Sequence, residues 1–177
     1  MGRALGIGVT LIAAAALVGV ALWLRGREDV EAAPAPACEP GGAATITGTV
    51  GEHVIAPIQS AWYAEFLAGA YVVVMDEGPG RCGDPSREAR HVGIWFPCGR
   101  VVPGEVAVRP RDEQTSCETP FASVVLERGT GGDLGSASSG TVVIESTAGC
   151  VRGRFDVAFP GGSQLRGSFG AVVCPNR

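Results

Sequence analysis

The sequence predicts an all-β domain, an antiparallel β-sandwich with a small barrel as the alternative, made of about seven or eight strands. Glycine is abundant, at 27 of 177 residues, and charged residues make up only 18% of the chain. Apolar residues alternate with polar ones in short runs that glycine and proline interrupt. This composition favours turn-rich β-structure, because long surface helices would need more glutamate and arginine.

One apolar segment precedes this domain and is predicted to be a transmembrane or signal helix. Residues 4–24 contain Thr10 as their only polar side chain, and Arg25 and Arg27 follow. A helix of this length is about 30 Å long, which matches the hydrocarbon core of a bilayer. Because the apolar core of a cleaved signal peptide usually has about 7–15 residues, an uncleaved signal anchor is the preferred interpretation. Trp23 suits the membrane interface at the end of such a helix.

Cleavage of this segment is the alternative interpretation. Ala35-Pro36-Ala37 before Cys38 supplies the small residues that a signal peptidase accepts, although these residues lie well past the apolar core. Residues 25–43 combine charges with repeated Ala-Pro and Gly-Gly, which is typical of a semi-extended linker. The chain is therefore expected to divide into an anchor or signal peptide at 1–24, a linker at 25–43 and a β domain at 44–177.

All six cysteines lie beyond the apolar segment, and no two of them form a C-x-x-C pair. Their even number and wide spacing predict disulfides rather than a zinc site or thioredoxin-type chemistry. Disulfides persist in oxidising compartments, so the domain is expected outside the cytoplasm, in the periplasm or at the cell surface. The predicted disulfide cysteines are Cys38, Cys82, Cys98, Cys117, Cys150 and Cys174.

Strand-length runs follow one another through the domain. Residues 45–50 alternate threonine with other residues, residues 70–75 form the continuous apolar run of a buried strand, and residues 91–96 alternate again. Residues 58–67 fit a short amphipathic helix and a strand equally well. The Gly/Ser-rich residues 129–140 are predicted to be a mobile connection. Further strands are expected at 105–108, at 121–127 and in a C-terminal hairpin.

The C-terminal hairpin allows its register to be predicted. The sequence VRGRF at 151–155 recurs as LRGSF at 165–169, on either side of a Pro-Gly-Gly-Ser turn. Keeping both apolar faces in the core restricts the register to every second residue. A five-residue loop would place Cys150 opposite Cys174 and predicts a disulfide between them, whereas a three-residue loop shifts the register by two. Cys82 is then expected to pair with Cys98 or Cys38.

Few residues in the chain suit catalysis or ion binding. His53 and His91 are the only histidines, and no serine lies in a G-x-S-x-G sequence, so a triad of His91 with Asp84 and a serine has little support. Asp76, Glu77 and Asp84 surround a Gly-Pro-Gly turn and could hold Ca²⁺, although solvated turn residues are the simpler interpretation. We therefore predict no cofactor and no resident metal ion, and we expect a protein that is not an enzyme.

Partner binding is the function class that these exclusions leave. The chain carries a net charge of −4, which is a poor match for nucleic acid. Trp62, Tyr63 and Trp95 are the candidate binding surface, because aromatic side chains on a strand face contact proteins and carbohydrates. Filling the core is their alternative role.

The end of the chain resembles a known class of proteins. The runs SGTVVIES at 139–146, GRFDVAF at 153–159 and LRGSFGAVVC at 165–174 are similar to the ends of many small β-rich lipoproteins of bacterial envelopes, whose function is unknown. The resemblance implies an envelope location and a β-rich fold, but no activity. The lipobox is incomplete, because Ala35 stands where leucine is expected, and lipidation of Cys38 would leave an odd thiol.

These observations predict a non-catalytic, extracytoplasmic β domain of the cell envelope. The N-terminal helix would hold it at the membrane, and its partner would be an envelope protein or a glycan. A secreted hydrolase with an unrecognised active site is the alternative.

Overall fold

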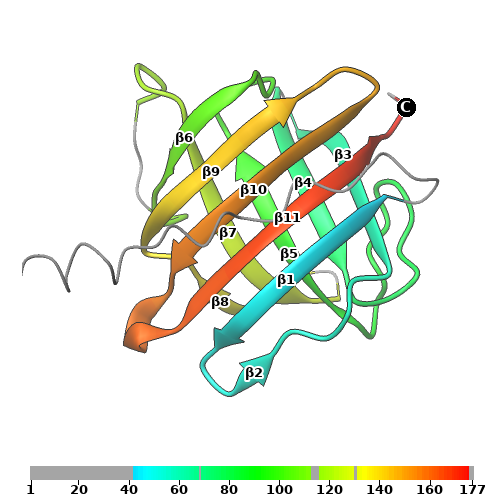
Figure 1. Cartoon of the computed structure of the whole chain (residues 1–177), viewed down its shortest axis with the longest axis vertical. Coiled ribbons are helices and arrows are strands. Elements are labelled where there is room, and N and C mark those ends of the chain that lie inside the picture. Colours follow the sequence, from blue (N-terminus) through cyan, green and yellow to red (C-terminus); the bar gives the residue numbers. More distant parts are fainter. Residues whose placement is uncertain (1–41, 68, 113–115, 130, 176–177) are drawn as a thin grey trace, which may run out of the picture. The chain divides into compact units, whose positions relative to one another are not determined.

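The computed structural model describes residues 42–67, 69–112, 116–129 and 131–175. This part of the chain forms eleven strands and one short 3₁₀ helix (Figure 1). The elements are β1 (Ala43–Val50), β2 (His53–Val54), β3 (Ser60–Leu67), β4 (Ala70–Asp76), β5 (Arg90–Phe96), β6 (Gly104–Val108), β7 (Phe121–Arg128), β8 (Gly132–Ser136), β9 (Ser139–Ser146), β10 (Cys150–Ala158), η1 (Pro160–Gly162) and β11 (Gln164–Val173).

Eight of these strands close into a barrel. They follow the order β10–β9–β6–β7–β5–β4–β3–β11, and the pairing of β11 with β10 completes the circle. The other three strands extend the sheet, since β1 pairs with β11, β2 pairs with β1, and β8 pairs with β7. The prediction of an all-β domain is therefore confirmed. The preferred sandwich is wrong, because the two ends of the sheet join, and the alternative barrel is the architecture found.

The sheet is mixed rather than antiparallel. Two contacts are parallel, β3 with β11 and β6 with β7, and each joins only two residue pairs. The remaining neighbours are antiparallel. Residues 58–67, which fitted helix and strand equally well, contain strand β3, because pairing with β4 satisfies their backbone.

The interior of the barrel is filled by the inward half of each alternating strand. On β4, for example, Val73 and Met75 belong to the interior core, whereas Val72 and Val74 face outward. The inside is therefore a packed core rather than a ligand cavity. The largest fully buried side chains are those of Phe169, Met75, Ile94, Leu126, Ile144 and Leu165.

The C-terminal hairpin adopts the shorter of the two predicted loops. Phe155 lies opposite Gly167, and Phe169 lies opposite Gly153, so each ring packs over a glycine. A Cβ atom on Gly153 would lie 2.8 Å from the Phe169 ring. The longer loop would instead have set the two rings opposite each other, so the fit of each ring over a glycine explains the observed register.

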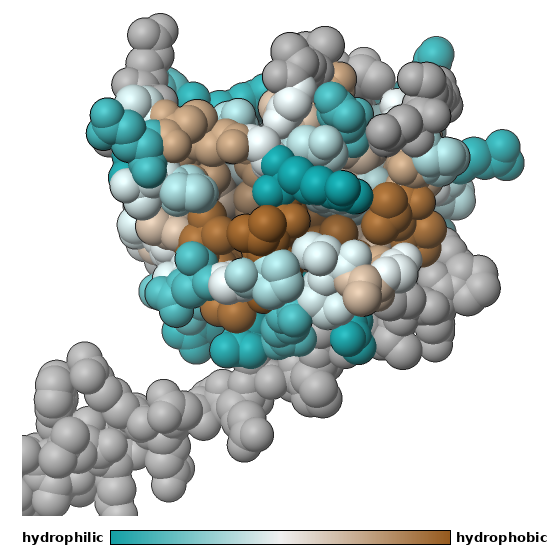
Figure 2. Space-filling model, turned by 90° about the horizontal axis from the view of Figure 1, so that it is seen from above, coloured by the Kyte–Doolittle hydropathy of each residue, from teal (hydrophilic) through white to brown (hydrophobic). Residues whose placement is uncertain are grey.

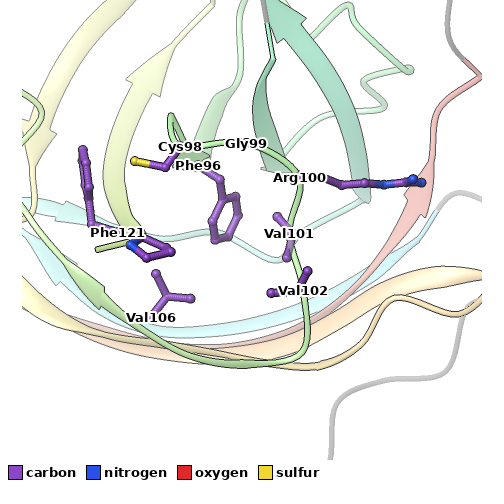
Figure 3. Close-up of a pocket in the computed structure, with 9 residues that line it drawn as sticks. Phe96, Cys98, Gly99, Arg100, Val101, Val102, Val106 and Phe121 are labelled. Atoms are coloured by element: carbon purple, nitrogen blue, oxygen red, sulfur yellow. The ribbon is translucent and has the colours of Figure 1, made fainter. Parts of the chain in front are cut away.

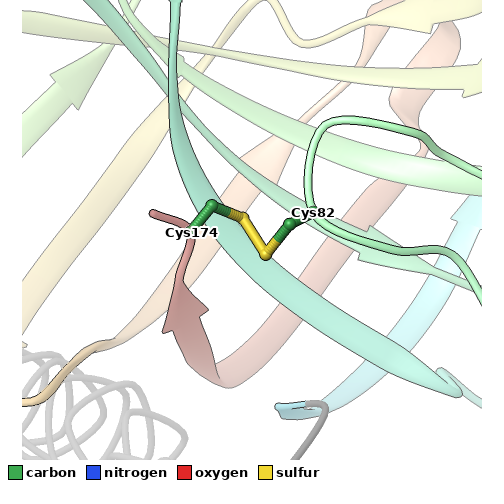
Figure 4. Close-up of a disulfide and its surroundings, with 2 residues drawn as sticks. All are labelled: Cys82 and Cys174. Atoms are coloured by element: carbon green, nitrogen blue, oxygen red, sulfur yellow. A yellow bond between two sulfur atoms is a disulfide. The ribbon is translucent and has the colours of Figure 1, made fainter. Parts of the chain in front are cut away.

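This register overturns the predicted Cys150–Cys174 disulfide, because Cys150 lies opposite Val172. Cys174 bonds to Cys82, as Figure 4 shows, and Cys98 bonds to Cys117. The expected pairing of Cys82 with Cys98 or Cys38 is therefore also wrong. Cys150 is buried and is itself disulfide-bonded, while Cys38 lies outside the described residues.

The Gly/Ser-rich stretch at 129–140 is more ordered than predicted. It contains β8, which pairs with β7, and the side chain of Leu134 packs against the interior core. The interpretation as a mobile connection was wrong, because the glycines allow a tight turn back onto β7. At Gly135, a Cβ atom would lie 2.8 Å from Val50, so only glycine fits there without a shift.

The expected N-terminal helix at 4–24 and most of the linker lie outside the described residues. Within the described part of the chain, no helix is long and apolar enough to cross a membrane. The disulfides indicate an oxidising, extracytoplasmic environment.

Candidate functional site

A second apolar cluster lies on the outside of the barrel, over β3 and β4. Its buried members are Trp62, Val72, Val74 and Cys174, and Trp95 packs against them. The Cys82–Cys174 disulfide fastens the β4–β5 connection to this face (Figure 4). The outer face of the strands β3, β4, β5 and β7 is therefore partly covered by the chain itself.

The three predicted aromatic residues do not share one surface. Trp62 is buried in the outer cluster. Tyr63 points into the barrel, where its ring stacks on Tyr71 at 5.5 Å and its hydroxyl accepts a hydrogen bond from the Val101 amide. Burial raises the pKa of the Tyr63 phenol above its ordinary value. Of the three, only Trp95 is half-exposed on the outer face.

Trp95 is the centre of a compact group on that face. The Phe66 and Trp95 rings form a T-shaped pair, with 4.7 Å between ring centroids and 89° between the two planes. The Arg111 guanidinium lies over the Trp95 ring, 5.2 Å from its centroid. The indole nitrogen lies close to the neighbouring residue on this face of β5, since a Cβ atom on Gly93 would be 3.1 Å from Trp95 Nε1. We call Phe66, Trp95 and Arg111 the aromatic–arginine surface.

A hydrogen-bonded pair of side chains supports Arg111 from beneath. Its Nη1 lies 2.8 Å from Glu127 Oε1, and Glu127 Oε2 lies 3.2 Å from His91 Nε2. His91 and Glu127 are buried cross-strand partners on β5 and β7. The hydrogen bond from His91 lowers the pKa of Glu127, burial opposes this effect, and Arg111 adds to it. Glu127 therefore fixes the position of Arg111 over Trp95.

Three buried ring nitrogens on this outer face have no hydrogen-bond partner: Trp62 Nε1, Trp95 Nε1 and His91 Nδ1. A buried polar atom without a partner costs about 1–3 kcal/mol of stability. The outer face thus leaves more buried polar atoms without a hydrogen bond than the apolar interior, which holds no such atom among the described residues.

The acidic residues considered for Ca²⁺ are engaged in holding the β4–β5 connection. Asp76 is fully buried and accepts hydrogen bonds from the Gly78 and Ser86 amides, both at 2.7 Å. Glu77 pairs with Arg90 Nε at 2.9 Å. In the described residues, no group of three or more His, Cys, Asp or Glu side chains is arranged to hold a metal ion.

The triad considered for His91 is not assembled. Its partner is Glu127, whereas Asp84 forms a backbone bridge with Arg81. Within the described part of the chain, no serine hydroxyl is hydrogen-bonded to His91. The second histidine, His53, lies on β2.

A small pocket opens at one end of the barrel, beneath the connection at 97–103, which we call the mouth loop (Figure 3). Its volume is about 70 Å³, whereas pockets for small-molecule ligands usually measure about 300–1,000 Å³. The Cys98–Cys117 disulfide fastens the mouth loop to the β6–β7 connection. The lining residues are Phe96, Cys98, Gly99, Arg100, Val101, Val102, Val106, Pro120 and Phe121.

Sequence reasoning identified Trp95 but missed the residues around it. Phe66 could have been found, because on a strand it shares a face with Trp62 and Ala64. Arg111 lies in a connection whose path the sequence does not reveal. Comparisons of the chain with protein-family models, with curated proteins and with solved structures find no match.

Proposed function

We propose that this protein is a non-catalytic, extracytoplasmic barrel domain that binds a protein partner through the aromatic–arginine surface. The observation that carries the proposal is the Arg111 guanidinium held over the half-exposed Trp95 ring, beside the exposed Phe66. Tryptophan, other aromatics and arginine are the residue types that contribute most to protein–protein affinity. Because Glu127 and the sheet fix the group in place, little conformational entropy is lost on binding.

A protein suits this surface better than a glycan. Sugar rings stack on an open aromatic face, but the Arg111 guanidinium lies over the Trp95 ring and the Phe66 ring packs against it at a right angle. What remains accessible is the guanidinium and the Phe66 ring. Those groups match the carboxylates and apolar side chains of a protein surface.

The same geometry supports a role without catalysis. Among the described residues, the barrel interior is filled with apolar side chains, and the mouth pocket of about 70 Å³ is small for a substrate. His91 is buried with Glu127 beneath Arg111, so its imidazole ring is poorly accessible to a substrate. A secreted hydrolase remains the alternative, and no arrangement among the described residues favours it.

The proposal includes attachment of the domain to the membrane by a helix at residues 4–24. It is supported by the bilayer length of this apolar run and by the disulfides that follow it. Mass measurement of the mature N-terminus tests it. A chain that retains the apolar segment is expected, and a chain that begins near Cys38 would reject the anchor.

Capture from solubilised envelope tests the binding surface with two matched arginine variants of the full chain. Arg111 and Arg154 each form an ion pair at 2.8 Å, and their side chains are 48% and 45% exposed. Arg154 pairs with Glu145 on the strands β9 and β10, away from Trp95. We expect the wild type and Arg154→Ala to capture the same protein, and Arg111→Ala and Trp95→Ala to lose it.

Equal capture by Arg111→Ala and Arg154→Ala would reject the aromatic–arginine surface. Capture of glycan in place of protein, checked by deglycosylating the envelope extract, would reject the choice of partner class. Circular dichroism and intact disulfides in each variant exclude misfolding as the cause.

A further inference from the structure

Three of the four exposed large apolar side chains in the described residues lie at the mouth end of the barrel. They are Val102, Phe66 and Val173, with 67%, 56% and 39% of their surface exposed. Val173 ends β11 and pairs with Tyr63, and the Tyr63 hydroxyl contacts the mouth loop at Val101. Phe66 follows on the same strand, one residue before its end. Because Phe66 already belongs to the aromatic–arginine surface, we call Val102 and Val173 the mouth surface.

The mouth end is apolar beyond these three residues. Figure 2 looks down on the molecule from the top of Figure 1 and shows a hydrophobic band across it, with polar residues on both sides. The valines of the mouth pocket, Val101, Val102 and Val106, contribute apolar lining there. The Cys98–Cys117 disulfide keeps the mouth loop in place, so Val102 is presented rigidly. Exposed Arg100 lies in the same loop.

The chain also joins the barrel towards this end. Ala43 at the start of β1 pairs with Gly170, and β11 runs on from there only to Val173. The preceding residues include the apolar run at 4–24, separated from β1 by a linker of the residues 25–42. Because the chain enters β1 at the mouth end, an anchor at 4–24 would favour presenting this end to the membrane.

We propose that the mouth surface rests on the lipid surface of the membrane, with Val102 and Val173 inserted at the level of the headgroups and Phe66 left free for the partner protein. This inference rests on the membrane attachment within the proposed function. Two side chains are too few for stable binding from solution, but a tether supplies a high effective concentration of membrane. Arg100 matches the phosphates of lipid headgroups.

A second copy of the chain is a poorer occupant for this surface. Stable protein–protein interfaces bury about 1,200–2,000 Å² in total, which needs roughly 20–30 residues on each side. The mouth surface offers two exposed apolar side chains beside a shallow pocket. A lipid surface requires no matching shape, so it accepts a patch of this size.

Quenching by brominated lipids tests the proposal in the full chain, reconstituted in phosphatidylcholine and phosphatidylglycerol vesicles. Val102→Trp is compared with Val54→Trp, because Val54 is 66% exposed and lies on β2 near the opposite end of the barrel. The emission of Trp23, Trp62 and Trp95 is measured in the wild type and subtracted. We expect lipids brominated close to the headgroup to quench the added tryptophan at least about twofold more at 102 than at 54.

Adding Val173→Ser to Val102→Trp should lower its quenching towards the value at position 54. Equal quenching at the two positions would overturn the inference. It would also be overturned if the tryptophan at position 102 were protected by contact between protein copies, so that its quenching changed with the protein density on the vesicle rather than with the brominated lipid. Flotation of the vesicles separates the two proposals. A chain that floats but shows equal quenching keeps its membrane attachment and loses the mouth contact, whereas a chain that does not float loses both.

Discussion

The inside of the barrel and the outer face of β3, β4, β5 and β7 are both covered, but by different means. Alternating apolar side chains from the barrel strands fill the inside, where Phe155 and Phe169 each pack on a glycine. The outer face is covered by connections, which a disulfide, a buried carboxylate and an ion-pair network hold in place. The packing of the inside therefore depends on the alternation of apolar residues in the strands alone. The cover of the outer face depends on disulfide formation and on charged side chains.

This difference also assigns stability to the interior and the proposed binding to the outer face. The interior core is built from apolar side chains, whereas Trp62, His91 and Trp95 each leave one buried ring nitrogen unpaired outside. Evolution can change a face held by connections without rebuilding the barrel, because connections tolerate substitution better than packed strands. The aromatic–arginine surface lies on this second kind of face.

Phe169→Ala should give the largest loss of stability, because it empties the centre of the interior. The expected decrease in the free energy of unfolding is about 3–5 kcal/mol. Chemical denaturation of the oxidised protein measures it. A decrease below about 1 kcal/mol would contradict a close-packed interior.

Replacing Cys82 and Cys174 together by serine should cost about 2–4 kcal/mol. This bond closes a sequence separation of 92 residues and fastens the outer cluster. The matched control, Cys98→Ser with Cys117→Ser, opens a separation of only 19 residues, so its loss should be smaller by about 1 kcal/mol. The reverse order would show that the outer cluster is stable without its clamp.

Peptide mapping without reduction checks the pairing that this comparison requires. The pairs Cys82–Cys174 and Cys98–Cys117 should be recovered. The count of six cysteines then leaves Cys38 as the expected partner of Cys150. Such a bond would exclude lipidation of Cys38, and a lipid-modified Cys38 would contradict it.

Asp76→Asn should destabilise the protein by about 1–3 kcal/mol, because the buried carboxylate accepts from two amides and an asparagine offers only one oxygen. Loss of protection at the Gly78 or Ser86 amide in hydrogen exchange would locate the effect in the β4–β5 connection. Unchanged exchange there would show that Asp76 does not hold this connection.

Acid should weaken the outer face by a smaller amount through Glu127. The pKa of the folded carboxyl is lowered, chiefly by His91, so its contribution is complete above the ordinary glutamate pKa of about 4.3 and is lost as the pH falls through the lowered value. The difference in unfolding free energy between the wild type and Glu127→Gln should therefore shrink below that pH. A difference that stays constant between about pH 6 and pH 3 would contradict this role.

Much of the strand pattern could be predicted from the sequence, because alternation is a local property. Residues 45–50, 70–75, 91–96, 105–108 and 121–127 all lie in strands. Barrel closure could not be predicted, since it depends on pairing β11 with β10 on one side and with β3 on the other. The β3 contact is parallel and only two residue pairs long, and a contact of that length leaves no pattern.

The site was harder to predict than the fold. Trp95 and His91 stand out in a chain with few aromatics and two histidines, but Glu127 and Arg111 look like ordinary surface charges. Their roles follow from the register of β5 on β7 and from the path of the β6–β7 connection. Similarly, the register of the β10–β11 hairpin depends on which residue lies opposite each phenylalanine. The alternation of apolar residues allows both registers, and only the space that each ring needs distinguishes them.

The position of Cys174, after the last strand of the barrel, has a consequence for the timing of assembly. When the domain is exported in the order of its sequence, Cys98 and Cys117 emerge close together, whereas Cys82 waits for a partner that follows β11. Until then Trp62, Val72 and Val74 lack their cover, and the circle of strands is open. The last strand to leave the membrane therefore completes both the barrel and its outer clamp, and a chain stalled late in transit would expose the apolar outer face to proteases and chaperones.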